Sequence, residues 1–512
     1  MRVADFESGG AGFSVRRRTF LQGVAGLVGV TILGAPAVRA ENSAAPLRVW
    51  SAQPGVASER IDGRAKVTGQ KVFARDFNAR DLPGWVDEQW HAMYLCALTT
   101  EHAFLGVDLS SLPPEARPTR VVLGDQLTQS QRAPKLRRTR DLMVEALARE
   151  AVAKVKLGVE AVSADLNSVI EYDLIVKPGA VPNFLGQGVA LLMFDSLARY
   201  RAARRLMQFR DADFQIYALD NGASFGMDKP YSPQTTYVKF VEDGKTFSYA
   251  TSDPKTYMDQ VPIYRGKIRD TLAQHPEFIR QEITVDTQAM EPMFMEPEAG
   301  LVWHESKTSS LHILLGTQSP DGDVADIISM YGAENSPLQI RDVVLTSCYP
   351  GGGFGGRDSS PFSLLLALAA AFSDGRPVKL AHDRFEQFRL GLKRPGAKIR
   401  GALVGAPNMK LQCVEATLNF NGGGLKNLSP YVANLASLCI GGAYEIPMAD
   451  IFAQSVHTQD IPGGSQRGFG GPEAFFAVRI SDDTDEQAVD RIMKVLRKWR
   501  DNYSLGSEKE KS

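Results

Sequence analysis

Gly351-Gly-Gly-Phe-Gly-Gly-Arg-Asp358 is the stretch that decides how this chain is interpreted. It holds five glycines around one phenylalanine. Glycine loses much backbone entropy on folding, so this many indicate a backbone that approaches a neighbour closely or takes positive φ. Residues 340–345 before it are apolar and β-branched, as in a strand, and residues 362–372 after it resemble a buried helix. A glycine loop in that position can present N–H groups to an oxyanion or a cofactor, although a tight turn alone would also explain it.

The overall composition is that of an ordinary globular protein. The chain has 512 residues, of which 44% are hydrophobic and 23% are charged. This length allows two to four domains, each with its own core. The formal net charge of −1 argues against a nucleic-acid-binding surface as the main function. We therefore expect no nucleic acid among the partners of this protein.

The first 40 residues have the features of a twin-arginine signal peptide. Arg16-Arg17-Arg18 precedes a moderately apolar stretch from Gly23 to Pro36, which is too short to span a bilayer permanently. Val38-Arg39-Ala40 then places small or compact residues at the −3 and −1 positions of a cleavage site. The twin-arginine route exports proteins that are already folded, often with a cofactor inserted. The sequence therefore predicts a folded protein in the periplasm, and a disordered tail that carries three arginines is the alternative.

Behind this leader the chain reads as two domains of mixed helix and strand, which predicts the α+β class. The predicted segments are 1–40 signal peptide, 41–59 lead-in, 60–219 first domain, 220–277 irregular connection, 278–480 second domain, and 481–512 C-terminal helix and charged tail. Within the first domain we expect strands at 60–76, 93–98, 120–123, 186–194 and 214–219, and helices at 140–160 and 196–207. Residues 484–503 have an amphipathic helical pattern that would need a partner surface.

The spacing of the cysteines and histidines does not predict a metal site. Cys96, Cys348, Cys413 and Cys439 lie far apart and include no C-x-x-C pair. This excludes the usual ligand sets of an iron–sulfur cluster or a structural zinc within the chain. The seven histidines show no ligand spacing, so we expect no metal bound directly by side chains. A metal carried by an organic cofactor would need hydrogen-bond donors instead.

Gly222-Ala-Ser-Phe-Gly226 matches the G-x-S-x-G pattern of a serine-hydrolase nucleophile elbow. The elbow requires a strand before it and a helix after it. A strand fits residues 214–219, but Met227–Pro233 contains two prolines and cannot open a regular helix. A hydrolase that uses Ser224, with His457 as its partner, is therefore the weaker alternative.

Three further stretches supply hydrogen-bond donors and carboxylates. Leu315-Gly-Thr-Gln318 places an amide side chain at the end of an apolar strand. Gly463-Gly-Ser-Gln-Arg467-Gly-Phe-Gly-Gly-Pro-Glu473 is a second glycine–phenylalanine loop, with an arginine at its head. Residues 288–298 mix carboxylates with apolar side chains. Each stretch alone could be a simple loop, but two Gly-Phe-Gly-Gly loops together with Gly-Thr-Gln form a much rarer combination.

These motifs resemble the molybdopterin-binding large subunit of the xanthine oxidase/aldehyde oxidase family, the molybdenum hydroxylases. The resemblance runs from about Arg60 to Ala477. Residues 60–76 and 186–207 are similar to the family's α/β-hammerhead domain, and the residues from 278 onward to its first molybdenum-cofactor-binding domain. The resemblance implies an α+β fold in which a hammerhead domain precedes this cofactor domain.

The resemblance also implies a molybdenum–molybdopterin cofactor, with the cytosine dinucleotide as one of its forms. Gln318 would donate a hydrogen bond to an oxo ligand of molybdenum. The backbone around Phe354 would pack against the ligand sphere of the metal, and Arg467 with two N–H groups would orient the substrate or the metal centre. The implied cofactor-binding residues are Gln318, Gly353, Phe354, Gly355, Arg467, Gly468 and Phe469.

Two further positions bear on the substrate. Asp358 stands where purine-oxidising members of the family carry a glutamate that contacts the substrate. Leu435, ahead of Tyr444-Glu-Ile-Pro447, stands where those members carry an arginine. A purine therefore fits poorly, and the resemblance implies hydroxylation of an aldehyde or an N-heterocycle with water as the source of oxygen.

The family mechanism needs a glutamate that acts as a general base. In the family this residue lies in a second cofactor domain beyond the Arg-Gly-Phe-Gly-Gly-Pro loop, and no glutamate of this sequence matches it. The catalytic base stays unassigned. The alternative is a non-catalytic or truncated protein, or half of a split subunit with residues 484–503 as a docking face. Electrons would leave through a separate 2Fe–2S small subunit, with a cytochrome c as one candidate acceptor. A second chain that carries the other cofactor domain is a further candidate partner.

Overall fold

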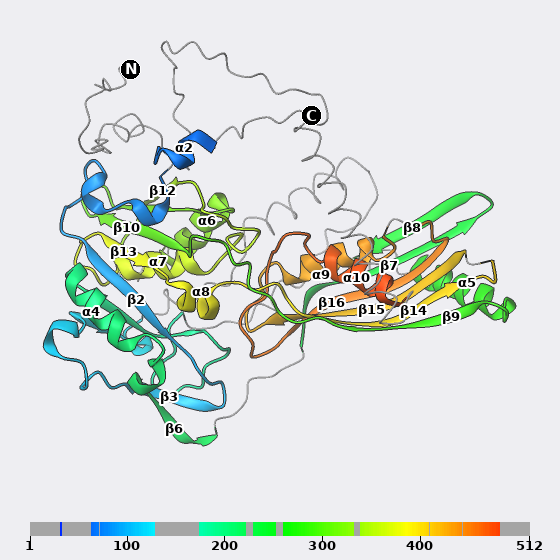
Figure 1. Cartoon of the computed structure of the whole chain (residues 1–512), viewed down its shortest axis with the longest axis horizontal. Helices are drawn as coiled ribbons and strands as arrows, with labels where there is room; N and C mark the ends of the chain where they lie inside the picture. Colours follow the sequence, from blue (N-terminus) through cyan, green and yellow to red (C-terminus); the bar gives the residue numbers. More distant parts are fainter. Residues whose placement is uncertain are drawn as a thin grey trace, which may run out of the picture. The chain divides into compact units, whose positions relative to one another are not determined.

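The structure is a computed structural model, and the residues it describes form two compact units (Figure 1). The described residues are 31–32, 63–70, 72–127, 174–221, 229–251, 260–331, 338–408, 410–442 and 444–481. Unit 1 holds the described residues before Phe225 together with Pro292–Gly391. Unit 2 holds the described parts of Gly226–Glu291 and Leu392–Ser512. Each unit is therefore assembled from separate stretches of the sequence.

Unit 1 is built on a mixed sheet of eight strands in the order β1-β12-β11-β10-β13-β2-β5-β4. β11 and β12 are parallel, as are β13 and β2, whereas β10 is antiparallel to both of its neighbours. The strands are β1 (Thr31–Ile32), β2 (Trp90–Cys96), β4 (Arg120–Val122), β5 (Gly188–Phe194), β10 (Ala299–Glu305), β11 (Ser310–Leu315), β12 (Asp342–Ser347) and β13 (Val378–Ala381). β3 (His102–Val107) and β6 (Gln215–Asn221) form a separate antiparallel pair.

Continuous apolar runs explain the interior of unit 1. Every residue of β2 and β5 is buried, which suits strands covered on both faces. Every residue of α7 (Phe362–Ala370) is also buried, so this helix is apolar all round rather than amphipathic. The other helices are α2 (Gly63–Val67), α4 (Leu197–Met207), α6 (Pro320–Tyr331) and α8 (Arg384–Leu390). α4 begins where the Ser196 side chain accepts a hydrogen bond from the Arg199 N–H.

Unit 2 is a sheet of six strands in the order β8-β7-β16-β15-β14-β9. The strands are β7 (Pro230–Glu242), β8 (Lys245–Thr251), β9 (Ile279–Asp286), β14 (Ala397–Gly405), β15 (Leu411–Gly423) and β16 (Met448–His457). Its helices are α5 (Gln260–Gln274), α9 (Ser429–Cys439) and α10 (Gly471–Ser481). All neighbouring strands are antiparallel except β15 and β16.

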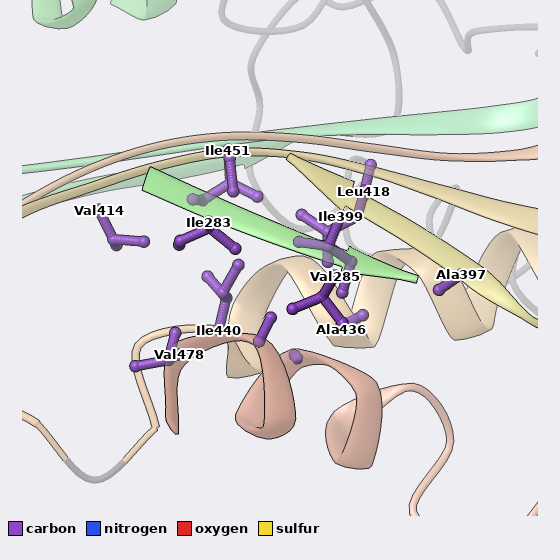
Figure 2. Close-up of a cluster of buried hydrophobic side chains, with 14 of the residues drawn as sticks. Ile283, Val285, Ala397, Ile399, Val414, Leu418, Ala436, Ile440, Ile451 and Val478 are labelled. Atoms are coloured by element: carbon purple, nitrogen blue, oxygen red, sulfur yellow. The ribbon is translucent and has the colours of Figure 1, made fainter. Parts of the chain in front are cut away.

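Alternation along the strands gives the unit 2 sheet two apolar faces. Leu403 belongs to the cluster that packs on α9 and α10, whereas the next residue, Val404, belongs to the cluster around α5. Figure 2 shows the first cluster, in which strand side chains such as Ile399 meet Ala436 of α9 and Val478 of α10. The two helices that border the second glycine loop are therefore anchored on a rigid core.

The strand–loop–helix arrangement around the first glycine run is confirmed. β12 ends at Ser347, the glycine run follows, and α7 begins at Phe362. The mixed helix and strand content also confirms the α+β class. β2 precedes the predicted connection at 220–277 and β13 follows it, yet the two strands pair in the unit 1 sheet.

Two local expectations are wrong. Residues 60–76 do not form a strand: the described part contains α2 and a short 3₁₀ turn at Ala74–Asp76. Residues 220–277 are not an irregular connection, since they contain β7, β8 and α5. The prolines at the start of β7 interrupt the strand pattern, and the alternation of buried residues is short, at Val238 and Phe240.

Several predicted segments lie outside the described residues. These are the signal peptide apart from β1, the helix at 140–160, the Gly222–Gly226 elbow with Ser224, and the amphipathic stretch at 484–503. His457, the other residue of the hydrolase alternative, is fully buried at the end of β16. All four cysteines are free thiols. None of the helices in the described ranges is both long and apolar enough to cross a membrane.

Candidate functional site

Residues Gly351–Arg357, here called loop 1, form a tight turn that displays a phenylalanine. The Gly356 N–H donates to the carbonyl of Gly353 at 2.7 Å. Between them Phe354 has φ +49° and Gly355 has φ +94°. Two central residues with positive φ and this hydrogen bond are the features of a type I′ turn. The phenylalanine therefore holds a conformation that non-glycine residues rarely adopt, with 47% of its surface exposed.

Gln318 is fixed against loop 1 by its side-chain oxygen. It lies three residues after the end of β11, and its Oε1 accepts from the Gly355 N–H at 3.0 Å and the Arg357 N–H at 3.3 Å. A Cβ atom on Gly353 would lie 2.4 Å from that oxygen, so a side chain there would displace the Gln318 amide. Because Oε1 is occupied, the exposed amide nitrogen of Gln318 is the group left to donate to a ligand.

Arg357 is a buried guanidinium that sequence reasoning missed. Its side chain is 1% exposed. Its Nε donates to the Gly352 carbonyl at 2.9 Å and its Nη1 to the Gly316 carbonyl at 3.1 Å. Its Nη2 reaches both the carbonyl and the carboxylate of Glu296, the latter at 3.3 Å. One side chain thus connects loop 1, the segment before Gln318 and the residues before β10.

Glu296 compensates this charge and holds the start of loop 1. Its Oε2 accepts from the Gly351 N–H at 2.8 Å and its Oε1 from the Arg75 N–H at 3.2 Å. The Glu296 side chain is 9% exposed. A Cβ on Gly351 would lie 2.4 Å from the Glu296 Cβ, so the protein itself requires this glycine.

Residues Gln466–Gly471, here called loop 2, repeat the turn in unit 2. The Gly471 N–H donates to the Gly468 carbonyl at 2.9 Å. Phe469 has φ +48° and Gly470 has φ +92°. The Phe469 N–H donates to the Gln466 carbonyl at 2.7 Å, which corrects the expectation that it faces a ligand. The Gly468 N–H has no partner among the residues that the structure describes.

Helix α9 and a second arginine support loop 2. A Cβ on Gly470 would lie 2.3 Å from the Val432 carbonyl oxygen of α9, and Phe469 packs against the core of Figure 2. The Arg394 guanidinium donates to the Arg467 carbonyl at 2.5 Å and to the Glu473 carboxylate at 2.9 Å. The Arg467 side chain itself is exposed and has no partner within the described ranges.

The predicted residues fall into two groups, each within one unit. Gln318, Gly353, Phe354, Gly355 and Asp358 come together in unit 1, where the Asp358 N–H donates to the Gly355 carbonyl at 2.9 Å. The second group, in unit 2, consists of Arg467, Gly468, Phe469 and Leu435. Leu435 lies on α9 with 37% of its surface exposed.

Known proteins resemble this chain over residues that include both loops. Residues 250–490 match the family model of the molybdopterin cofactor-binding domain. The chain is 28% identical over 193 residues to the nicotinate dehydrogenase large molybdopterin subunit of Eubacterium barkeri, covering 38% of this chain and 44% of that protein. It is 28% identical over 191 residues to the xanthine dehydrogenase of Oryza sativa subsp. japonica, covering 37% and 14%. These matches support a molybdopterin-binding protein of the xanthine oxidase family.

Solved structures of this kind share the fold. The aldehyde oxidoreductase of Desulfovibrio desulfuricans ATCC 27774 superposes with a TM-score of 0.55 at 16% identity, covering 83% of this chain and 41% of that chain. The quinoline 2-oxidoreductase of Pseudomonas putida 86 gives a TM-score of 0.53 at 16% identity, covering 83% and 47%. At this identity the likeness concerns the fold alone. The chain spans less than half the length of each of these relatives and structures.

The polar groups left open at each loop are of the kinds that a pterin cofactor can bind. A pterin offers both N–H donors and oxygen or nitrogen acceptors. The Gln318 amide nitrogen, the Gly468 N–H and the Arg467 guanidinium are donors that the described residues do not use. Glu473 Oε2 and Gln466 Oε1 are buried acceptors without a partner among the described residues. Buried polar atoms without partners are rare in native proteins, so these two indicate a missing ligand or water.

Cys348 is not part of this chemistry. It is 4% exposed and packs with Leu314 and Ala299 in the core of unit 1. Burial, reinforced by the charge of Glu296, raises the pKa of the Cys348 thiol far above its usual value. The thiol therefore stays protonated and acts as a small apolar residue.

Proposed function

We propose that this chain forms the molybdopterin-binding part of an oxidoreductase that hydroxylates an aldehyde or an N-heterocycle, with water as the source of oxygen. The observation that carries the proposal is the fixed amide of Gln318. Its oxygen is held by two N–H groups of loop 1, so its nitrogen is presented as an oriented donor beside the Phe354 turn. An oriented donor next to a positive-φ glycine turn suits a ligand with acceptor oxygens.

Each residue of the site has a definite task in this proposal. When bound, the molybdenum cofactor supplies the two-electron oxidation chemistry. Gln318 donates from its amide nitrogen to an acceptor of the cofactor, and Phe354 offers an exposed apolar face that limits the access of water. Arg467 offers an exposed guanidinium for an anionic or carbonyl group of substrate or cofactor. Asp358 and Leu435 would bear on the choice of substrate, because neither residue reproduces the purine-binding pair of the family.

The remaining parts of the system are also proposed. The general-base glutamate stays unassigned, and a second chain that carries another cofactor domain is a proposed partner. Electrons would pass to a 2Fe–2S small subunit and then to an acceptor such as a cytochrome c. The cofactor would be inserted before export by the twin-arginine route, as the Arg16–Arg18 motif suggests. Replacing Arg16 and Arg17 by lysine and assaying periplasmic and cytoplasmic fractions would test the route.

Metal and pterin analysis tests the proposal directly. The chain would be produced with its genomic neighbours in a host that makes molybdenum cofactor, and purified. We expect molybdenum by mass spectrometry and a fluorescent pterin after oxidative release, in equal molar amounts. A Gln318→Ala variant that remains folded should retain less of both, whereas Gln281→Ala, on the exposed edge strand β9, is the matched control. A folded protein without molybdenum or pterin would contradict the proposal.

A further inference from the structure

The two glycine–phenylalanine turns are equivalent in backbone geometry. In both, the phenylalanine has φ close to +50° and the next glycine has φ above +90°. In both, the second glycine after the phenylalanine donates its N–H to the carbonyl of the residue before the phenylalanine: Gly356 to Gly353, and Gly471 to Gly468. A non-glycine residue with positive φ is strained and persists only where its surroundings hold it.

The groups that hold the two turns are equivalent as well. Each loop accepts a hydrogen bond from an arginine at the carbonyl two residues before its phenylalanine. Arg357 donates to the Gly352 carbonyl at 2.9 Å, and Arg394 donates to the Arg467 carbonyl at 2.5 Å. In each loop the same guanidinium also binds a glutamate carboxylate. We call Arg357–Glu296 the loop-1 pair and Arg394–Glu473 the loop-2 pair.

Both pairs are largely withdrawn from solvent. The side chains are 1% and 9% exposed in the loop-1 pair, and 13% and 5% exposed in the loop-2 pair. Among the charged pairs of the described residues, many others are far more exposed, such as Arg400–Asp286 at 44% and 52%. Burying a guanidinium is costly unless its N–H groups are hydrogen-bonded. Here they bind a loop carbonyl and the carboxylate of a glutamate that compensates the charge.

The two arginines reach their loops from different places in the sequence. Arg357 is the last residue of loop 1, whereas Arg394 belongs to a separate segment whose N–H donates to the Met290 carbonyl at 2.8 Å and whose carbonyl accepts from the Met290 N–H at 3.1 Å. The shared feature is therefore the contact and not a repeated sequence motif. Because arginines from two different segments make the same contact, we take the contact to be the feature that both turns need.

We infer that the loop-1 and loop-2 pairs are matched positioning devices, each of which fixes a turn that presents groups to the cofactor or substrate. The inference rests on the proposed function, because it assigns the two turns a common ligand-facing role. The arginines and glutamates are positioning residues: within the described structure they touch the loops, and the loops carry the contacts to Gln318, the exposed Phe354 and the exposed Arg467.

The experiment compares hydrogen exchange of the loop amides in cofactor-free protein. Arg357→Lys and Arg394→Lys keep the charge but lose the fork. We expect the amides of Gly355 and Gly356 to exchange on the order of tenfold faster in Arg357→Lys, as follows from losing one or two hydrogen bonds to a charged group. The amides of Phe469 and Gly471 should respond in the same way to Arg394→Lys. Each variant should leave the other loop unchanged.

Matched controls separate positioning from general stability. Arg210→Met in unit 1 and Arg400→Met in unit 2 remove exposed arginine–aspartate pairs and should alter neither loop. If the lysine variants keep wild-type exchange, or if exchange rises uniformly across a unit, the pairs are merely structural and the inference is overturned. Should a lysine variant not fold, Glu296→Gln and Glu473→Gln, which preserve the shape of the acceptor, give the same comparison.

A second readout distinguishes failure of this inference from failure of the proposed function. In protein matured with cofactor, the lysine variants should retain several-fold less molybdenum and pterin than wild type at equal thermal stability. Loop-specific exchange changes in a protein that never binds molybdenum would support the pairs and refute the proposed function. Normal loop exchange in variants of a protein that does bind molybdenum would refute the pairs alone.

Discussion

Loop 1 and loop 2 adopt the same turn but are supported differently. Loop 1 is held by polar groups: Arg357 with its carbonyl and carboxylate acceptors, and Gln318 with two N–H donors. Loop 2 is held by one arginine and by close packing of Gly470 on the backbone of α9. The carboxylate oxygens of Glu296 both have partners, whereas Oε2 of Glu473 has none among the described residues.

This difference teaches what a Gly-Phe-Gly-Gly motif specifies. The motif encodes a positive-φ turn, since both loops show it. It does not encode what stabilises the turn, nor which polar groups remain open for a ligand. Loop 1 uses up its carboxylate internally and leaves an amide donor, whereas loop 2 leaves a carboxylate oxygen and an arginine. The two loops therefore offer different groups to a ligand.

The largest expected effect comes from breaking the loop-1 pair. Glu296→Ala leaves the buried Arg357 without its compensating charge, so unit 1 should lose about 3–5 kcal/mol of unfolding free energy. Glu473→Ala should cost less, about 1–3 kcal/mol, because Arg394 is more exposed. Urea denaturation measures both. A double variant, Glu296→Leu with Arg357→Met, should be closer to wild type than Glu296→Ala, and equal losses of below about 1 kcal/mol in the two single variants would contradict this account.

Adding a methyl group to each loop should sharpen the comparison. Gly470→Ala combines φ +92° with a Cβ 2.3 Å from the Val432 carbonyl, so it should destabilise unit 2 by about 2–4 kcal/mol. Gly353→Ala meets only the movable end of Gln318, so it should cost about 1 kcal/mol of stability. Urea denaturation of the two variants measures both losses, and equal losses would contradict the different supports of the two loops.

Gly353→Ala and Gly470→Ala should also differ in their molybdenum content. Gly353→Ala displaces the Gln318 amide, so it should lower molybdenum content more than its small effect on stability would suggest. Gly244→Ala in the β7–β8 turn, which has positive φ but open space around the new Cβ, controls for backbone strain alone. A Gly353→Ala protein with full molybdenum content would break the assignment of Gln318.

The last expected effect concerns acid. His382 lies in unit 1, fully buried beside Gln387, with Arg204, Arg75 and Arg357 acting on it, and burial lowers its pKa to about 3. The unfolded chain therefore takes up a proton near the ordinary histidine pKa, while the folded chain does so only near pH 3. Stability is complete above the unfolded-state pKa and is lost as the pH falls toward 3. Taken alone, His382 should remove about 2 kcal/mol of unfolding free energy between pH 7 and pH 5.

His382→Leu should reduce that loss, as urea midpoints at the two pH values would show. His275→Gln, at an exposed ion pair of unit 2, is the control and should keep the wild-type slope. Burial raises the pKa of the Glu386 carboxyl to about 7, so this group makes the folded protein more stable as the pH falls, the opposite of His382. Because Glu386 is present in all three proteins, its effect cancels in the comparison. An unchanged pH slope in His382→Leu would show that acid acts on unit 1 through other groups.

Local features of the site could be predicted from the sequence, and long-range ones could not. The strand before loop 1, the helix after it and the place of Gln318 at the end of β11 follow from apolar patterns and glycine spacing. Arg357 and Glu296 are 61 positions apart, and a pattern of single residues gives no signal for such a pair. An arginine is also usually exposed, so its burial could not be expected.

The sequence also could not show why these positions are glycine. The motif suggested close approach of the backbone to a metal centre, yet Gly351 and Gly470 are each required by a neighbour within the protein. The polar strand β7 was missed because its prolines interrupt the alternation that marks a strand. In both cases the deciding information lies in segments distant along the chain.

Differential amide exchange tests most directly the claim that loop 1 and loop 2 each contribute groups to the binding of a molybdopterin cofactor. Purified cofactor-free protein would be compared with protein matured with cofactor. We predict slower exchange in peptides that cover Gly351–Arg357 and Gln466–Gly471, and no change in the β7–β8 hairpin. Cofactor that copurifies with the chain while leaving the exchange of both loops unaltered would contradict the claim.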